Sequence, residues 1–134
     1  MLKDIEIKNN ANVGVAIVKE LNEDLETVWN VFVVNLGDEM ISNVFVTCKG
    51  YGTINGEPKE TSVMRYFLDD IEPQTAVKVE PINPELFQLN NEYFLVFYQN
   101  GNMIDKKITF KENSITEESL VQVTLLDRMG VLII

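Results

Sequence analysis

The chain has 134 residues, the length of one ordinary domain, and 46% of them are hydrophobic. There are 21 acidic residues against 11 basic ones, and the resulting net charge of −10 repels the phosphates of nucleic acids and of anionic membranes. The absence of histidine excludes a Ser-His-Asp triad, a Cys-His pair and every histidine-bearing zinc site. A single cysteine excludes an intramolecular disulfide and a four-thiolate zinc cluster.

Alternation of apolar and polar residues is the dominant pattern along the chain, and it is typical of β-strands. In chain order it predicts short strands at Ile5–Ile7, Val13–Lys19, Thr27–Asn35, Ser42–Lys49, Ser62–Leu68, Thr75–Ile82, Tyr93–Tyr98, Lys106–Lys111 and Val121–Leu126. Two short segments compete with this pattern. Residues 18–29 could hold a helical turn capped by Asn22, and residues 113–120, "NSITEESL", are typical of a single capped turn.

Strands at these spacings, with little helix, predict the fold class. We expect an all-β protein, an antiparallel immunoglobulin-like β-sandwich of about 7–9 strands. No repeat, low-complexity segment or long linker divides the sequence, so we expect a single domain over residues 1–134. The Cys–Trp–Cys spacing of antibody domains is absent, so the prediction concerns the shape of the sandwich only.

The stretch Val28–Gly52 holds the only tryptophan, Trp29, and the only cysteine, Cys48. We expect it to form a hairpin in the core, with two apolar runs meeting across the polar bend "GDE". Counting faces places Cys48 inward, where burial raises the pKa of a thiol, so we interpret it as a small buried hydrophobe. Phe45 and Tyr51 fall on the opposite face and are candidates for contact with a partner.

The second half of the chain contains the plainest strand and turn signals. In "TAVKVEPI" the alternation places Val79 on one face and Glu80 on the other. The run Tyr93–Tyr98 is apolar on both faces, so we expect it in the centre of a sheet and covered on both sides. Asn100-Gly101 follows it, and this pair best tolerates the positive φ angles of a type I′ hairpin turn. Asn55-Gly56 marks a second turn, which Pro58 closes.

Carboxylates cluster at residues 20–26 and 69–72, and paired carboxylates can hydrolyse glycosides or hold calcium. Neither cluster has the spacing of a calcium loop. The segment "LDDIEP" is typical of a strand end entering a turn. One hypothesis keeps an enzymatic or ligand-binding role for Asp69 and Asp70, with Arg65 nearby.

The chain ends on four consecutive apolar residues, Val131, Leu132, Ile133 and Ile134. An apolar end of this kind must be covered, because an open strand edge otherwise pairs with other chains. It can be the last strand of its own sandwich, which we favour, or it can dock onto a second copy by edge addition. We keep these four residues, with Phe45 and Tyr51, as the candidate interaction surface.

The chain resembles a family of small uncharacterised bacterial β-sandwich proteins of about this length, through the ordered segments "WNVFVVN", "KGYG", "TSVMRYFLDDI", "NNEYFLVFY", "DKKITF" and "GVLI". The likeness runs from "VAIVKE" to the end and implies a compact single β-domain. Some members carry a phenylalanyl-tRNA synthetase subunit label, which implies an accessory role in tRNA aminoacylation. Neither arginine, Arg65 or Arg128, lies in a recognisable synthetase motif, so the resemblance implies no catalytic residue. The strand that holds Trp29 is also similar to strands of adaptor-ear-like and other immunoglobulin-like binding modules.

These patterns together predict a non-enzymatic β-sandwich that binds a protein partner or associates with itself as a homodimer. We expect no cofactor, no metal, no nucleic-acid partner and no membrane partner. Met1 is followed by "LKDIEIKNN", which has no apolar signal-peptide region, so we expect a cytoplasmic protein. Two alternatives stay open: a small carboxylate-based enzyme or ligand-binding domain, and an accessory factor of tRNA aminoacylation.

Overall fold

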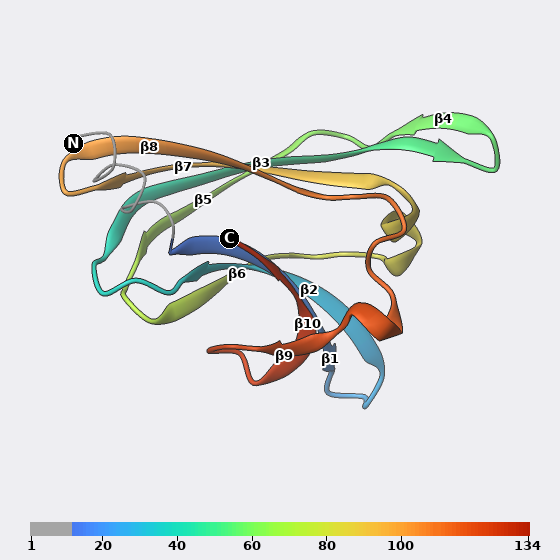
Figure 1. Ribbon diagram of the computed structural model, residues 1–134, viewed down its shortest axis with the longest axis horizontal. Helices are drawn as coiled ribbons and strands as arrows, with labels where there is room; N and C mark the ends of the chain where they lie inside the picture. Colours follow the sequence, from blue (N-terminus) through green and yellow to red (C-terminus); the bar gives the residue numbers. More distant parts are fainter. Residues whose placement is uncertain (1–11) are drawn as a thin grey trace.

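The computed structural model describes residues 12–134, which form a β-sandwich of two antiparallel five-stranded sheets (Figure 1). Sheet A has the strand order β6-β2-β1-β10-β9. Sheet B has the order β4-β3-β7-β8, and β5 pairs with β3 beside β4 on the same edge. In chain order the elements are β1 (Val13–Leu21), β2 (Thr27–Asn35), β3 (Ile41–Ile54), β4 (Glu57–Glu60), β5 (Met64–Ile71), β6 (Thr75–Pro81), η1 (Pro84–Gln88), β7 (Asn90–Gln99), β8 (Asn102–Phe110), η2 (Glu117–Ser119), β9 (Val121–Val123) and β10 (Arg128–Ile133).

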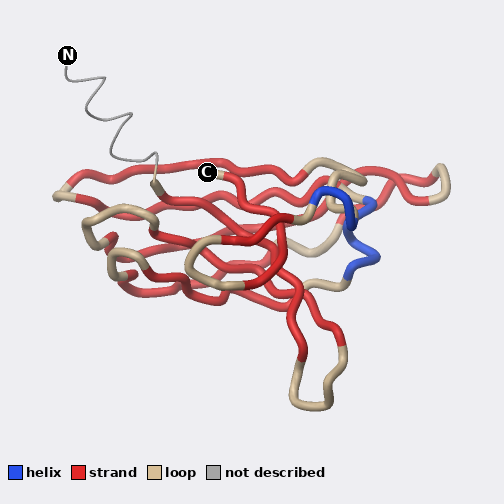
Figure 2. Tube along the Cα trace, turned by 60° about the horizontal axis from the view of Figure 1, so that its bottom comes forward, coloured by secondary structure: helices blue, strands red, loops and turns tan. Residues whose placement is uncertain are grey.

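The all-β prediction is confirmed, and the helices of the described residues are short 3₁₀ segments (Figure 2). The strand predicted at Ile5–Ile7 lies outside the described residues. Alternation does not predict β4, because all four of its residues are exposed and leave no apolar face to recognise.

The core lies between the two sheets and is built from the inward side of each strand. Fully burying an aliphatic or aromatic side chain of this kind contributes roughly 1.5–3 kcal/mol. At one end of the core, the Trp29 ring packs edge-to-face on Phe87 with the ring centroids 5.1 Å apart. The central members are Val13, Val15, Ile17, Val31, Val33, Ile41, Val44, Val46, Ile71, Leu95 and Phe97, all essentially buried.

Both turns predicted from Asn-Gly pairs are confirmed. Asn55-Gly56 joins β3 to β4, and Asn100-Gly101 joins β7 to β8. All four residues have φ angles between 53° and 79°, as a type I′ turn requires.

One of the two predicted helical turns forms and the other does not. Residues 117–119 form η2 with Thr116 as N-cap, as expected for "NSITEESL". The helical turn predicted around Asn22 is wrong, because this segment is the loop of the β1–β2 hairpin. The Asn22 Oδ1 accepts hydrogen bonds of 2.9 Å from the backbone N–H groups of Asp24 and Glu26 and so stabilises the loop.

The predicted core hairpin between Val28 and Gly52 is wrong in its pairing. Strand β2 belongs to sheet A and β3 to sheet B, so the two apolar runs face each other across the core and do not pair. The buried Asn35 anchors the crossing, because its amide donates to the carbonyls of Glu39 and Ile71 and its Oδ1 accepts from the N–H of Gly37. Paired strands and facing strands show the same alternation, so the sequence pattern does not distinguish them.

The outer face of sheet A carries a second, smaller apolar cluster near its last strand, β9, which lies at the bottom of the molecule in Figure 1. Val123 is buried there against Ala16, Val18 and Val34. Strand β10 approaches β1 closely at Gly130, where an added Cβ would lie 2.3 Å from the Ile17 carbonyl oxygen. Glycine is therefore required at this position by the close approach of two backbones.

Strand β7 is central in sheet B, but only one of its faces is covered within residues 12–134. Tyr93, Leu95 and Phe97 point into the core and are buried. Phe94 and Val96, on the other face, are half-buried, and Tyr98 is exposed. The prediction that this run is covered on both sides is therefore wrong for the described chain, and its outer face belongs to the candidate site.

Candidate functional site

The outer face of sheet B carries a contiguous group of apolar side chains, which we call the aromatic patch. Alternation turns these side chains away from the core, and the strand register makes them neighbours. Four strands contribute: β3, β5, β7 and β8. The members are Phe45, Phe67, Phe94, Val96, Tyr98 and Met103.

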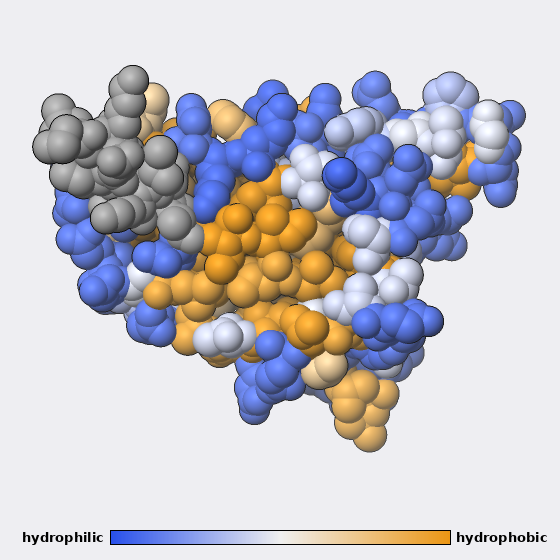
Figure 3. All heavy atoms as spheres, viewed as in Figure 1, coloured by the Kyte–Doolittle hydropathy of each residue, from blue (hydrophilic) through white to orange (hydrophobic). Residues whose placement is uncertain are grey.

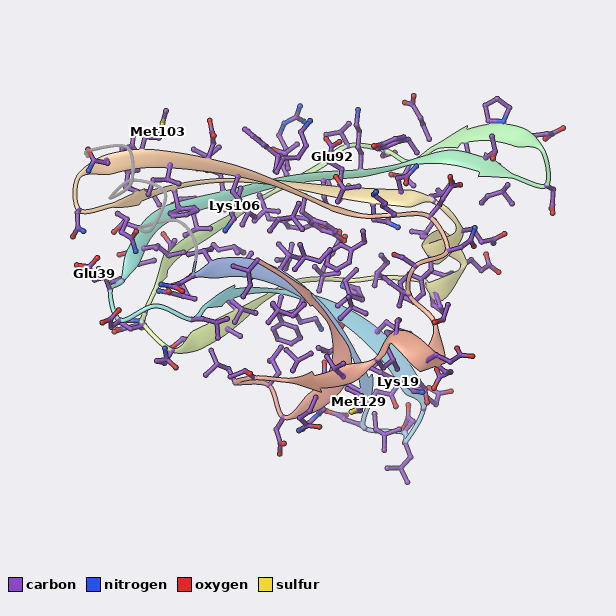
Figure 4. The ribbon with its side chains drawn as sticks, viewed as in Figure 1. Lys19, Glu39, Glu92, Met103, Lys106 and Met129 are labelled. Carbon is purple, nitrogen blue, oxygen red and sulfur yellow. The ribbon has the colours of Figure 1, made fainter. Side chains whose placement is uncertain are left out.

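The most exposed aromatic pair of the patch is Phe45 and Phe67, which lie directly opposite each other on β3 and the edge strand β5. Their ring centroids are 4.7 Å apart, and the two side chains are 51% and 50% exposed. Met103, at 63%, is still more exposed and projects from β8 away from sheet A (Figure 4). Two neighbouring aromatic rings that keep half of their surface in water form no part of the core, and they make this face the candidate functional site.

The charges around the aromatic patch are nearly balanced, although the whole protein is strongly acidic. Lys49, Arg65 and Lys107 project from the same face as the patch, together with Glu92 and Asp105. This face therefore carries little of the net charge of −10. A balanced apolar face is suited to protein contact, whereas a nucleic acid would require a basic one.

The structure separates the six residues predicted as an interaction surface into two groups. Phe45 lies in the centre of the aromatic patch. Tyr51 shares its face of β3 but lies six residues further along, half-exposed, with the Lys49 Nζ 5.8 Å from its ring centroid. The C-terminal residues Val131–Ile134 lie on sheet A, so the six do not form one surface.

The C-terminal tail is the strand β10, paired with β1 over Val15–Val18. Val131 and Ile133 pack against the main core, and Leu132 packs on the opposite face of sheet A. Ile134 is exposed, and apolar side chains show at the surface on the side where the chain ends (Figure 3). The tail is thus the last strand of its own sandwich with its outer edge at the surface.

A polar cluster joins the two sheets on the inner side of the sandwich. Glu80 of β6 accepts hydrogen bonds from the Tyr66 hydroxyl at 2.7 Å and from the Tyr93 hydroxyl at 3.1 Å. The Cys48 thiol donates to the same carboxylate at 3.7 Å. One carboxylate of sheet A thus holds three strands of sheet B, β5, β7 and β3.

A β-bulge turns Glu80 inward, against the expectation from alternation. The register pairs Phe32 with Lys78 but Val31 with Glu80, so Val79 is an extra residue in β6. Such a bulge shifts the following side chain to the other face of the sheet. The sequence carries no turn or glycine signal for it, which is why the alternation misplaced this residue.

The polar cluster does not activate a nucleophile. Burial, followed by the charge and the hydrogen bond of Glu80, raises the pKa of the Cys48 thiol to about 12. The hydrogen bond to Glu80 raises the pKa of Tyr66, and burial raises that of Tyr93. All three groups therefore stay protonated at neutral pH, as the interpretation of Cys48 as a buried hydrophobe expects.

A cavity of about 210 Å³ lies beside Glu80 and is lined partly by Cys48 and Tyr93. Other polar groups of its wall are bonded within the protein. The Thr61 hydroxyl accepts from the N–H of Gly50 at 2.7 Å, and the Asn91 amide donates to the Leu86 carbonyl at 2.8 Å. The wall therefore offers few unsatisfied groups to a ligand.

The carboxylates proposed for catalysis lie at the end of β5. Arg65, Asp69 and Asp70 are all exposed, and the Asp70 Oδ1 accepts a hydrogen bond from the backbone N–H of Asn43 at 3.1 Å. Asp69 has a φ of 60°, in keeping with a strand end that bends. Among residues 12–134, no three His, Cys, Asp or Glu side chains gather in a way that would hold a metal ion.

Most of the aromatic patch was not singled out from the sequence. Adjacent aromatic residues such as Phe97 and Tyr98 must point to opposite faces of a strand, which is a signal that one of them is exposed. Phe67 and Met103 give no such signal, because their proximity to Phe45 and Tyr98 depends on the strand register. Register is a tertiary property that alternation does not determine.

Comparison of the chain with protein-family models, with curated proteins and with solved structures found no match. Within the described residues, no helix has the length and apolar character that a membrane span requires. The geometry of the surface is therefore what bears on function.

Proposed function

We propose that the protein is a non-enzymatic, immunoglobulin-like binding module of the cytoplasm, which contacts another protein or a second copy of itself through the aromatic patch. The observation that carries this proposal is the pair Phe45 and Phe67, two neighbouring rings tilted by 39° to each other and half-exposed on the outer face of sheet B. Aromatic residues and methionine are enriched at the centres of protein interfaces.

Two further observations support a binding role. The patch lies on the pleated face of a paired sheet, so its side chains are held in fixed positions and little conformational entropy is lost when a partner binds. The charged residues around it, such as Arg65 and Asp105, form the polar rim that surrounds the apolar centre of most interfaces. The single, buried cysteine suits a reducing compartment such as the cytoplasm.

The test is affinity capture from native cells with three forms of the full chain. The double substitution Phe45→Thr with Phe67→Thr removes the exposed ring pair of the patch while keeping residues that favour strands. The control is Leu25→Asn, which removes an apolar side chain that is 77% exposed in the β1–β2 loop and suits the positive φ of 62° at this position. We expect wild type and control to retain the same proteins and the double variant to lose them at least tenfold. Equal capture by all three forms would sink the proposal.

A further inference from the structure

We infer that the occupant of the aromatic patch is a second copy of this chain, related by a two-fold axis that runs across the strands of sheet B. This inference rests on the proposed function and names the partner of the same surface. Two-fold contacts are isologous, so the surface must be complementary to itself. The sequence of side chains along the strands provides that complementarity.

The register arranges the outer face of sheet B in rows that cross the strands β5, β3, β7 and β8. Each row holds one outward residue from each strand, and successive rows are two residues apart along the chain. The first row is Phe67, Phe45, Val96 and Asp105, and the second is Arg65, Thr47, Phe94 and Lys107.

A two-fold axis between these two rows exchanges them face to face. It places Asp105 of each copy opposite Lys107 of the other, which forms two equivalent ion pairs. On β5 the same operation places each Phe67 ring against the other copy's Arg65, a cation–π arrangement. The apolar residues of β7 and β3 then meet along the centre. No two side chains of like charge in these two rows lie opposite each other in this arrangement.

The charge of the molecule also favours this face for self-association. Two copies with a net charge of −10 repel each other, so they approach best where the acidic excess is smallest. The outer face of sheet B is that kind of surface, with Lys49, Arg65 and Lys107 balancing Glu92 and Asp105. A basic partner would instead be attracted to surfaces that carry the acidic excess.

The size of the patch indicates a weak dimer. Four strands about 4.8 Å apart and four rows about 6.8 Å apart, the two named rows and one on either side, cover roughly 19 Å by 27 Å, or about 500 Å² on each copy. Stable interfaces bury about 800 Å² on each partner. The dimer should therefore be in reversible equilibrium with the monomer. Added salt should strengthen it, because salt screens the repulsion between the two acidic molecules.

The experiment is sedimentation equilibrium of the full chain over a range of protein concentrations, at low and at moderate NaCl. We expect a monomer–dimer equilibrium for wild type that tightens with salt. Asp105→Lys and Lys107→Asp should each weaken the dimer at least fivefold, because each single change brings like charges together. The double swap, Asp105→Lys with Lys107→Asp, should restore it, because the two-fold axis again pairs opposite charges.

Three outcomes would overturn the inference. A chain that stays monomeric at all concentrations excludes a second copy as partner, and patch-dependent capture of another protein would then leave the proposed function standing. Dimerisation unaffected by Phe45→Thr with Phe67→Thr would place the contact elsewhere, for example on the edge of β10. A double swap no better than the single changes would exclude the two-fold register.

Discussion

The Tyr66 hydroxyl donates a 2.7 Å hydrogen bond to Glu80, and this bond joins β5 of sheet B to β6 of sheet A. The two strands follow each other in the chain but lie in different sheets. Tyr93 and Cys48 donate to the same carboxylate, so the polar cluster fixes the position of sheet A against three strands of sheet B. A core made only of aliphatic side chains would specify that position less strictly.

Removing one donor from this cluster should reduce stability without changing the fold. For Tyr66→Phe we expect the free energy of unfolding to fall by about 1–2 kcal/mol, because a hydrogen bond to a charged acceptor is lost. The matched control is Tyr98→Phe, which removes a hydroxyl from an exposed side chain on the outer face. Urea denaturation of both variants at low protein concentration measures the difference. Equal stability of the two variants would mean that the Tyr66 bond contributes nothing.

The protein should lose stability in alkaline solution through the same cluster. Burial and Glu80 raise the pKa of Cys48 from 9.0 to about 12, so the native state holds its proton after the unfolded state has released it. The stabilisation from the raised pKa of Cys48 is complete below pH 9 and is lost as the pH rises from 9 towards 12. Over that range, a proton held only by the native state lowers the free energy of unfolding by about 1.4 kcal/mol for each pH unit. The raised pKa values of Tyr66 and Tyr93 act in the same direction above pH 10.

Urea denaturation between pH 7.5 and 10.5 measures this dependence, and Cys48→Ala isolates the thiol. The variant should be less stable at pH 7.5, because its side chain leaves a small cavity, and its stability should fall less steeply above pH 9 than that of wild type. Parallel curves for the two proteins would contradict a raised thiol pKa. The comparison removes the general effect of growing negative charge, which both proteins share.

Much of the fold could be predicted from local patterns. Alternation located most strands, and the Asn-Gly pairs located both tight turns, because a type I′ turn needs positive φ at two residues and few pairs tolerate it. The separation of β2 and β3 into different sheets could not be predicted in this way. It depends on which strands meet after the chain crosses from sheet A to sheet B at Asn35, and no local pattern records that choice.

The candidate site was predictable only in part, for a related reason. Phe45 could be placed on the face opposite Cys48 by counting residues, and it lies there in the structure. The neighbour that completes the pair, Phe67, is distant in sequence and depends on register. Glu80 was misplaced because one extra residue, Val79, reverses the alternation within β6.

The close approach of β10 to β1 should make Gly130 intolerant of any side chain. In Gly130→Ala the Cβ would lie 2.3 Å from the Ile17 carbonyl oxygen and 2.8 Å from the Val18 Cα, and both are backbone atoms that cannot rotate away. We expect a loss of more than about 2 kcal/mol, in the range of overpacked cores. Gly37→Ala is the matched control, because its Cβ would meet side-chain atoms no closer than 3.4 Å. Thermal denaturation should show a lower midpoint for Gly130→Ala only.

The C-terminal strand should be required for folding. A chain that ends at Gly130 loses Val131–Ile133, which provide three of the four residue pairs between β10 and β1 and pack on both faces of sheet A. Deleting three half-buried aliphatic side chains costs several kcal/mol, which is comparable to the whole stability of a domain of this size. We expect the shortened chain to give a far-UV circular dichroism spectrum of an unfolded or aggregated protein.

Removal of Ile134 alone is the matched control, since this residue is exposed and follows the last paired position of β10. That variant should fold and melt close to wild type. A chain ending at Gly130 that is folded and monomeric would show that the tail serves an interface and not the core. Phe45 and Phe67 lie on sheet B, whereas β10 belongs to sheet A. Variants of the aromatic patch should therefore keep the native circular dichroism spectrum, which distinguishes them from the chain that ends at Gly130.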